Sequence, residues 1–99
     1  MTQPWKPITN SCDLKHLGKL GEELGEASAA TSRCIIQGMS GLEPITSKPN
    51  SRWLEEEIAD VLANISLVVE RFSLDKEFIV KREARKIAQL REWHQMLED

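Results

Sequence analysis

The chain has 99 residues, of which 40% are hydrophobic and 29% are charged, and its net charge at pH 7 is −3. This is the composition of an ordinary globular chain, and the length predicts one domain over residues 1–99. The acidic balance argues against a protein that coats nucleic acid, so we expect no stable nucleic-acid partner. The sequence contains no 18-residue apolar run and no signal peptide, which argues against membrane insertion and secretion. Cys12 and Cys34 lack zinc-site spacing, and they favour free thiols and a cytoplasmic location.

Residues 1–10 contain two prolines and a tryptophan, and they predict an extended arm before a helix cap at Asn10 or Ser11. Trp5 has two interpretations in such an arm. It is either a hydrophobic anchor against the body of the protein, which we favour, or a contact to a substrate.

Apolar residues at three- and four-residue steps predict a first long helix from about Cys12 to Gln37, which Gly38 is placed to end. The stripe consists of Leu14, Leu17, Leu20, Leu24, Ala27, Thr31, Cys34 and Ile35. One flank of this stripe consists of His16, Lys19, Glu23, Glu26, Ala30 and Arg33. Glu22 falls on the opposite side, which we expect to be solvated.

Residues 38–51 are rich in turn-forming residues and predict a loop, with Asn50 or Ser51 as the cap of the following helix. A loop of this length in a small domain is often functional. It therefore forms either a rim over a substrate or a solvated connector.

The second helix is predicted from Trp53 to near Phe72. Its apolar stripe consists of Leu54, Ile58, Val61, Leu62, Ile65, Val69 and Phe72. Glu57, Asp60 and Asn64 follow one flank of the stripe, whereas Glu55 and Glu56 point toward water. For Trp53 itself, packing under the loop is favoured over stacking on a base.

Each of these two helices carries an acidic pair at i, i+3 beside its predicted packing face, Glu23 with Glu26 and Glu57 with Asp60. If the helices pack antiparallel, the four carboxylates converge, and their like charges repel strongly at low effective dielectric. A hard divalent cation relieves this repulsion. Ligation by oxygen alone suits Mg²⁺ or Mn²⁺.

A third helix is predicted to begin at Ser73 or Asp75. Its apolar stripe consists of Phe78, Ile79, Ile87, Leu90, Trp93 and Leu97. Arg82 and Lys86 fall on or beside this stripe. They either meet the phosphates of a metal-bound nucleotide or neutralise the surplus acids directly.

The segment Glu22-Glu23-Leu24-Gly25-Glu26, followed by Glu57-Ile58-Ala59-Asp60, resembles the E-E-x-x-E … E-x-x-D signature of the MazG-like, all-α nucleoside triphosphate pyrophosphatases. The resemblance extends from about Lys15 to Trp93, and the segment between the two motifs is long for the family. It implies an all-α MazG-like helical bundle. Three main helices are expected, with the four-helix bundle completed by the N-terminal arm, by a second subunit, or by both, in a homo-oligomer (dimer or tetramer).

The same resemblance implies a Mg²⁺-dependent pyrophosphohydrolase that converts a nucleoside triphosphate, ribo- or deoxyribo-, and water into the monophosphate and pyrophosphate, with Mn²⁺ as a possible substitute. The expected metal ligands and catalytic residues are Glu23, Glu26, Glu57 and Asp60. The expected substrate contacts are Asn64, Arg82, Lys86, Lys19 and Trp5.

Two other functions fit parts of the pattern. The first is a non-catalytic, oligomeric helical interaction module that retains the acidic metal site. The second is a di-iron carboxylate bundle, which is disfavoured because His16 and His94 do not complete the Glu-x-x-His pairs of that design. Nothing in the sequence predicts which base or sugar is preferred.

Overall fold

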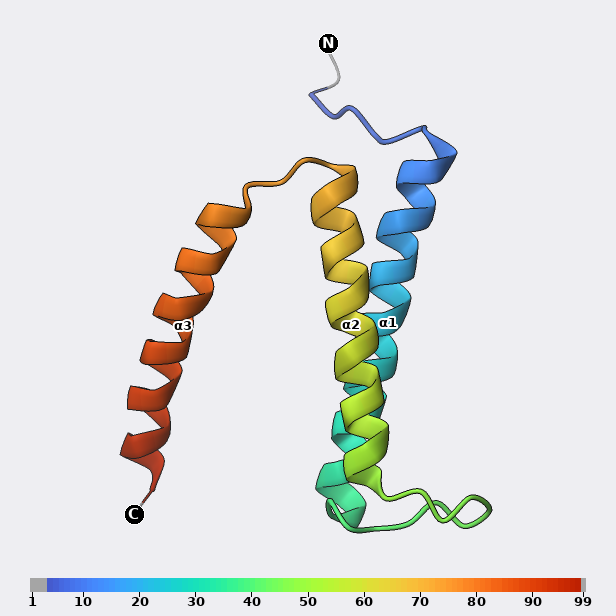
Figure 1. The fold of residues 1–99 in the computed structure, drawn as a ribbon, viewed down its shortest axis with the longest axis vertical. Helices are drawn as coiled ribbons and strands as arrows, with labels where there is room; N and C mark the ends of the chain where they lie inside the picture. The colour runs from blue at the N-terminus through green and yellow to red at the C-terminus, as the bar shows by residue number, and fades with distance from the viewer. Residues whose placement is uncertain (1–3, 99) are drawn as a thin grey trace.

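The structure is a computed structural model of the chain and describes residues 4–98. These residues form three α-helices, α1 (Ser11–Gln37), α2 (Asn50–Arg71) and α3 (Lys76–Leu97), with no strand among them. The predicted all-α class is therefore confirmed. α1 and α2 pack against each other as a helical hairpin, whereas α3 stands apart from both (Figure 1). None of the described helices is long and apolar enough to cross a membrane.

Polar side chains and a glycine define the helix ends where the sequence predicts them. The Asn10 side-chain oxygen accepts hydrogen bonds from the backbone N–H groups of Cys12 and Asp13, at 2.9 and 3.0 Å, and so caps α1. Gly38 ends α1 with a φ of 84°, a left-handed value that favours glycine. Asp75 caps α3 by accepting a hydrogen bond of 2.9 Å from the N–H of Phe78.

The start of α2 differs from the prediction. The helix begins at Asn50 rather than Trp53, and the Asn50 side chain makes no capping hydrogen bond. Instead it is fully buried, at 0% exposure, and its amide donates to Gln37 Oε1 at 3.2 Å and to the Gly38 carbonyl at 3.0 Å. A Cβ at Gly41 would lie 2.8 Å from Asn50 Nδ2 and 2.7 Å from the Gln37 carbonyl oxygen, so only glycine fits there. Asn50 thus ties the beginning of α2 to the end of α1.

Replacing this amide should destabilise the hairpin. We expect Asn50→Ala to lower the free energy of unfolding by about 1–3 kcal/mol, because the fully buried Asn50 amide is removed together with its hydrogen bonds to Gln37 and Gly38. The control is Asn64→Ala, since the Asn64 amide donates at 2.8 Å to the Asp60 carbonyl of its own helix. Urea denaturation of both variants checks the prediction, and equal losses would contradict it.

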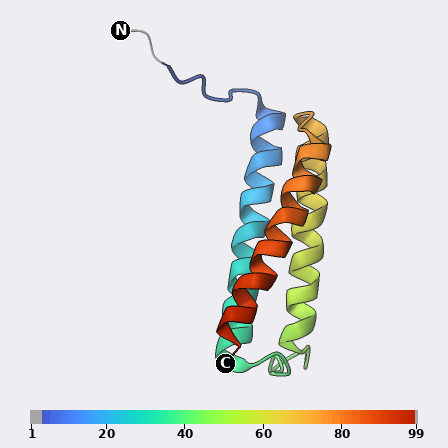
Figure 2. The ribbon, with the colours of Figure 1, turned by 90° about the vertical axis from the view of Figure 1, so that its left-hand side faces the viewer.

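The hairpin is antiparallel. Arg71 Nε near the end of α2 lies 2.8 Å from Asp13 Oδ1 near the start of α1, while Asn50 meets Gln37 at the other end. Figure 2 shows the two helices side by side over their length, with the connecting segment at one end. Residue numbers therefore rise along α1 while those of the facing α2 residues fall.

α1 and α2 meet along one edge of each predicted apolar stripe and the polar flank beside it. The buried or half-buried positions recur at three- and four-residue steps and include Leu20, Glu23, Ala27, Ala30 and Cys34 on α1, with Leu54, Glu57, Val61, Asn64 and Val68 on α2. By contrast, much of the predicted core is exposed, for example Leu24 at 50% and Leu62 at 58%. Two helices alone bury only one narrow face each, so a wide apolar stripe needs further neighbours.

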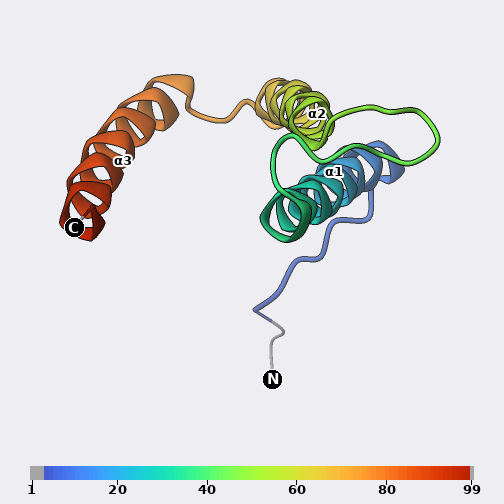
Figure 3. The same ribbon diagram turned by 90° about the horizontal axis from the view of Figure 1, so that it is seen from below.

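α3 lies well away from the hairpin when the molecule is viewed along the helices (Figure 3). Its apolar residues are largely exposed, including Phe78 and Trp93, and Ile79 is its one half-buried position. α3 thus leaves its predicted apolar stripe uncovered within one copy of the chain.

Candidate metal centre

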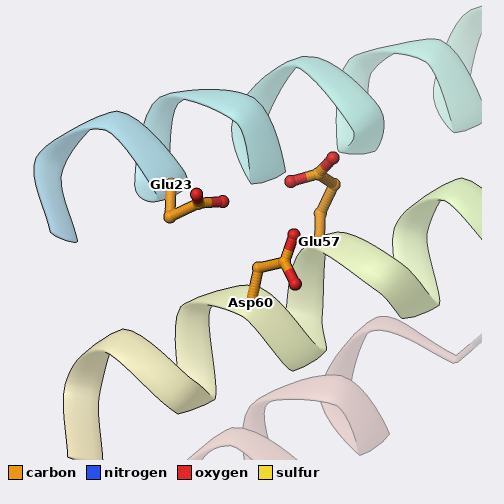
Figure 4. A group of neighbouring side chains, drawn as sticks. All are labelled: Glu23, Glu57 and Asp60. Carbon is orange, nitrogen blue, oxygen red and sulfur yellow. The ribbon is translucent and has the colours of Figure 1, made fainter. Parts of the chain in front are cut away.

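Three carboxylates from the two hairpin helices meet at mid-length. Glu23 comes from α1, and Glu57 and Asp60 come from α2, as Figure 4 shows. One carboxylate oxygen from each lies within 4.8 Å of the other two. Glu23 is buried at 6% exposure, Glu57 is half-buried and Asp60 is exposed. We call Glu23, Glu57 and Asp60 the carboxylate trio.

The hydrogen-bond partners of the trio leave oxygens free. Lys19 Nζ lies 3.2 Å from Glu23 Oε1 and 3.3 Å from Glu22 Oε1, so one ammonium bridges the two acids. Oε2 of Glu23 and Oε2 of Glu57 are buried and have no hydrogen-bond partner among the described residues. A buried carboxylate oxygen without a donor is costly. The trio could therefore hold a metal ion, and its all-oxygen ligand set fits a hard divalent cation.

Glu26, the fourth acid of the sequence prediction, is not one of the three residues with oxygens within 4.8 Å of one another. It is exposed and lies close enough to Glu23 that the negative charge of Glu23 raises the pKa of Glu26, with smaller contributions from desolvation and from Glu57. Glu26 also lines a cavity together with Glu57. The described geometry is thus a trio with a fourth carboxylate at its edge.

Because the pKa of Glu26 is raised, we predict that Glu26→Gln increases the stability of the fold, by an amount that depends on pH. Because the folded pKa lies above the unfolded one, the stability that this group contributes is lost as pH rises through the folded pKa. In EDTA at pH 7, Glu26→Gln should therefore melt at a higher temperature than the wild type. The gain should vanish at about pH 3 and below, where the carboxyl is largely protonated in both states. Thermal melts at both pH values check this, and Glu22→Gln is the control that should show no gain.

Two cavities flank the trio along the hairpin. The first, of about 540 Å³, is lined by Lys15, His16, Gly18, Lys19, Glu22, Asn64 and Leu67. The second, of about 320 Å³, is lined by Glu26, Ala29, Ala30, Arg33, Trp53 and Glu57. We call them the Lys19 cavity and the Trp53 cavity. Because the helices are antiparallel, the carboxylate trio lies between the Lys19 cavity and the Trp53 cavity. Helical spacing puts both cavities on the same side of the hairpin.

The structure brings Lys19 and Asn64 together but not the other predicted substrate contacts. Lys19 and Asn64 line the same cavity. Arg82 and Lys86 lie together on the surface of α3, beside Phe78, Ile79, Glu83 and Ile87, and α3 stands away from the hairpin. Trp5 is 72% exposed, so the favoured anchor interpretation is wrong within a single chain. Residues 1–3 of the predicted arm lie outside the described residues.

Two residues that the sequence interpretation did not assign to the site belong to it by position. Arg33 and Trp53 both line the Trp53 cavity, and the Arg33 Cζ lies 5.4 Å from the centroid of the Trp53 ring. Lys48 Nζ lies 4.3 Å from the same centroid. The sequence analysis placed Arg33 on the flank that carries Glu26 and favoured packing for Trp53, but it gave neither residue a role in the site. Arg33 follows Glu26 by two helical turns and Trp53 precedes Glu57 by one, so helical spacing puts each on the face of its neighbouring acid.

Comparison with protein-family models, with curated proteins and with solved structures finds no match to this chain. The chemistry of the site is therefore argued from its own residues and their arrangement.

Proposed function

We propose that the chain is a MazG-like, Mg²⁺-dependent nucleoside triphosphate pyrophosphohydrolase, which converts a nucleoside triphosphate and water into the monophosphate and pyrophosphate. The observation that supports this most is the carboxylate trio, with two buried oxygens that have no partner. The trio comes from the two helices that carry the E-E-x-x-E and E-x-x-D motifs. Mn²⁺ has the same preference for oxygen ligands and is the expected substitute.

In this proposal each residue near the trio has a defined role. Glu23, Glu57 and Asp60 hold the metal, and Glu26 at their edge adds a fourth carboxylate. A bound Mg²⁺ would neutralise phosphate charge and lower the pKa of an attacking water. Lys19 Nζ lies 3.2 Å from Glu23 Oε1. A cation on the carboxylates would compete with that ion pair, and the Lys19 ammonium would then be available to a phosphate in the Lys19 cavity beside Asn64.

We also propose a homo-oligomer, a dimer or tetramer, in which a second copy completes the four-helix bundle. The support is the apolar surface on both parts of the chain, such as Leu24 and Leu62 on the hairpin and Trp93 on α3. Such packing would cover these faces. It would also allow Arg82 and Lys86 of α3 to approach the carboxylates of another copy, which they do not reach within one chain.

Metal binding should be visible as stabilisation. At about a hundred times its Kd, Mg²⁺ is expected to stabilise the wild type by about 2.7 kcal/mol, because it binds only the folded state. Glu57→Gln should abolish most of that gain, whereas Glu56→Gln, whose carboxylate pairs with Lys48, should keep it. Thermal melts in Mg²⁺ and in EDTA measure the difference. Identical wild-type curves in the two conditions would contradict a divalent-metal site.

The reaction itself is tested with a set of nucleoside triphosphates in Mg²⁺, with pyrophosphate and orthophosphate measured separately. We expect pyrophosphate and the monophosphate as products. Release of orthophosphate would overturn the assigned bond cleavage. Stabilisation by Mg²⁺ with no turnover of any triphosphate would favour the non-catalytic helical module instead.

A further inference from the structure

Arg33 is an exposed side chain that lines the Trp53 cavity together with two acids, Glu26 and Glu57. Hydrogen bonds from Thr46 and Ile45 lower the pKa of Glu43, and the charge of Arg33 adds a smaller contribution. Among residues 4–98, none of the ion pairs involves Arg33. Its guanidinium lies over the Trp53 ring, with Cζ 5.4 Å from the centroid. A guanidinium held over an aromatic face keeps the N–H groups at its edge available as a rigid fork of donors. Arg33 is thus positioned by Trp53, and no ion pair within the described residues occupies its N–H groups.

The surroundings of Arg33 leave room for a flat group. Ala29 and Ala30 line the same cavity of about 320 Å³, a size within the range of small-molecule sites. The Trp53 indole Nε1 is also buried without a hydrogen-bond partner in the described chain. Unpaired donors at a cavity of this size point to a ligand that offers acceptors.

The next step rests on the proposed function. Cleavage between the α- and β-phosphates at the metal places the pyrophosphate on one side of the trio and the nucleoside on the other. The Lys19 cavity offers two lysines and a histidine beside one acid, Glu22, whereas the Trp53 cavity offers one arginine beside two acids, Glu26 and Glu57. The more highly charged pyrophosphate therefore fits the Lys19 cavity. The uncharged base fits the Trp53 cavity.

We propose that Arg33 is a specificity residue that donates two parallel hydrogen bonds to adjacent acceptors on the base, as O6 and N7 of guanine provide. Adenine offers N7 beside an amino group, which repels a second donor. The chain therefore selects guanine triphosphates over adenine triphosphates, and Trp53 acts as the positioning residue that orients the guanidinium.

The test compares kcat/KM for pyrophosphate release from GTP, 7-deaza-GTP, ATP and CTP in saturating Mg²⁺. The 7-deaza analogue lacks only the N7 acceptor. We expect GTP to be preferred over each of the others by about tenfold or more. Arg33→Met should reduce the GTP-to-ATP ratio to within about threefold. Arg33→Lys keeps the charge but not the fork, so it should also lose the preference.

Arg52→Met is the matched control, because Arg52 is exposed, pairs with Glu55 at 3.3 Å and does not line the cavity. It should keep the wild-type ratio. Equal kcat/KM for GTP and 7-deaza-GTP, a preference for CTP, or a ratio preserved in Arg33→Lys would overturn the role of Arg33 and leave the pyrophosphohydrolase standing. Absence of pyrophosphate release from every triphosphate would overturn both.

Discussion

Glu57→Gln is expected to lower kcat/KM for pyrophosphate release by at least about a hundredfold, as the loss of a charged metal ligand would. Glu57 supplies one oxygen of the carboxylate trio, and its Oε2 is buried without a hydrogen-bond partner in the described chain. The amide of glutamine offers one neutral oxygen in place of a charge. Steady-state kinetics with Mg²⁺ measure the loss.

The neighbouring acid is the control. Glu56 is exposed and pairs with Lys48 at 3.1 Å, so Glu56→Gln should stay within a few-fold of the wild type. A second matched pair lies on α1, where Lys19 contacts both Glu22 and Glu23. Glu23→Gln should resemble Glu57→Gln, and Glu22→Gln should resemble Glu56→Gln. Equal losses within either pair would show that the trio is not the catalytic centre.

Leu62→Glu is expected to convert an oligomer into monomers. Leu62 is 58% exposed on α2, in the middle of the uncovered apolar stripe. In a monomer, a substitution at such a position changes stability by only about 0.5 kcal/mol or less. If a second copy covers Leu62, a buried carboxylate opposes association, and the melting temperature should fall by more than about 5 °C.

Light scattering coupled to size-exclusion chromatography measures the mass of each species. Ala63→Glu is the matched control, since Ala63 is exposed on the same helix and lies outside the apolar stripe. It should leave both the mass and the melting temperature close to wild-type values. A wild-type chain that elutes as a monomer would contradict the proposed oligomer directly.

Local interactions explain why the helices could be predicted from the sequence. Asn10 and Asp75 cap their helices by bonding to N–H groups two or three residues away, and Gly38 ends α1 through its own φ. Such interactions depend on neighbours in the chain, so residue order reveals them. The spacing of Glu23 and of Glu57 with Asp60 likewise placed each carboxylate on a predictable helix face.

What only the tertiary structure decided is which helix faces meet. Periodicity places Leu24 and Leu62 in apolar stripes, but it does not determine whether α1, α2, α3 or another copy covers them. For the same reason the sequence could not show that Glu26 lies at the edge of the trio. It also could not show that Arg82 and Lys86 lie away from the carboxylates within one chain. Asn50 looked like a cap because its burial depends on the far end of α1. Arg33 and Trp53 come together across the hairpin, and their contact depends on the distance and rotation between two helices, which neither helix specifies alone.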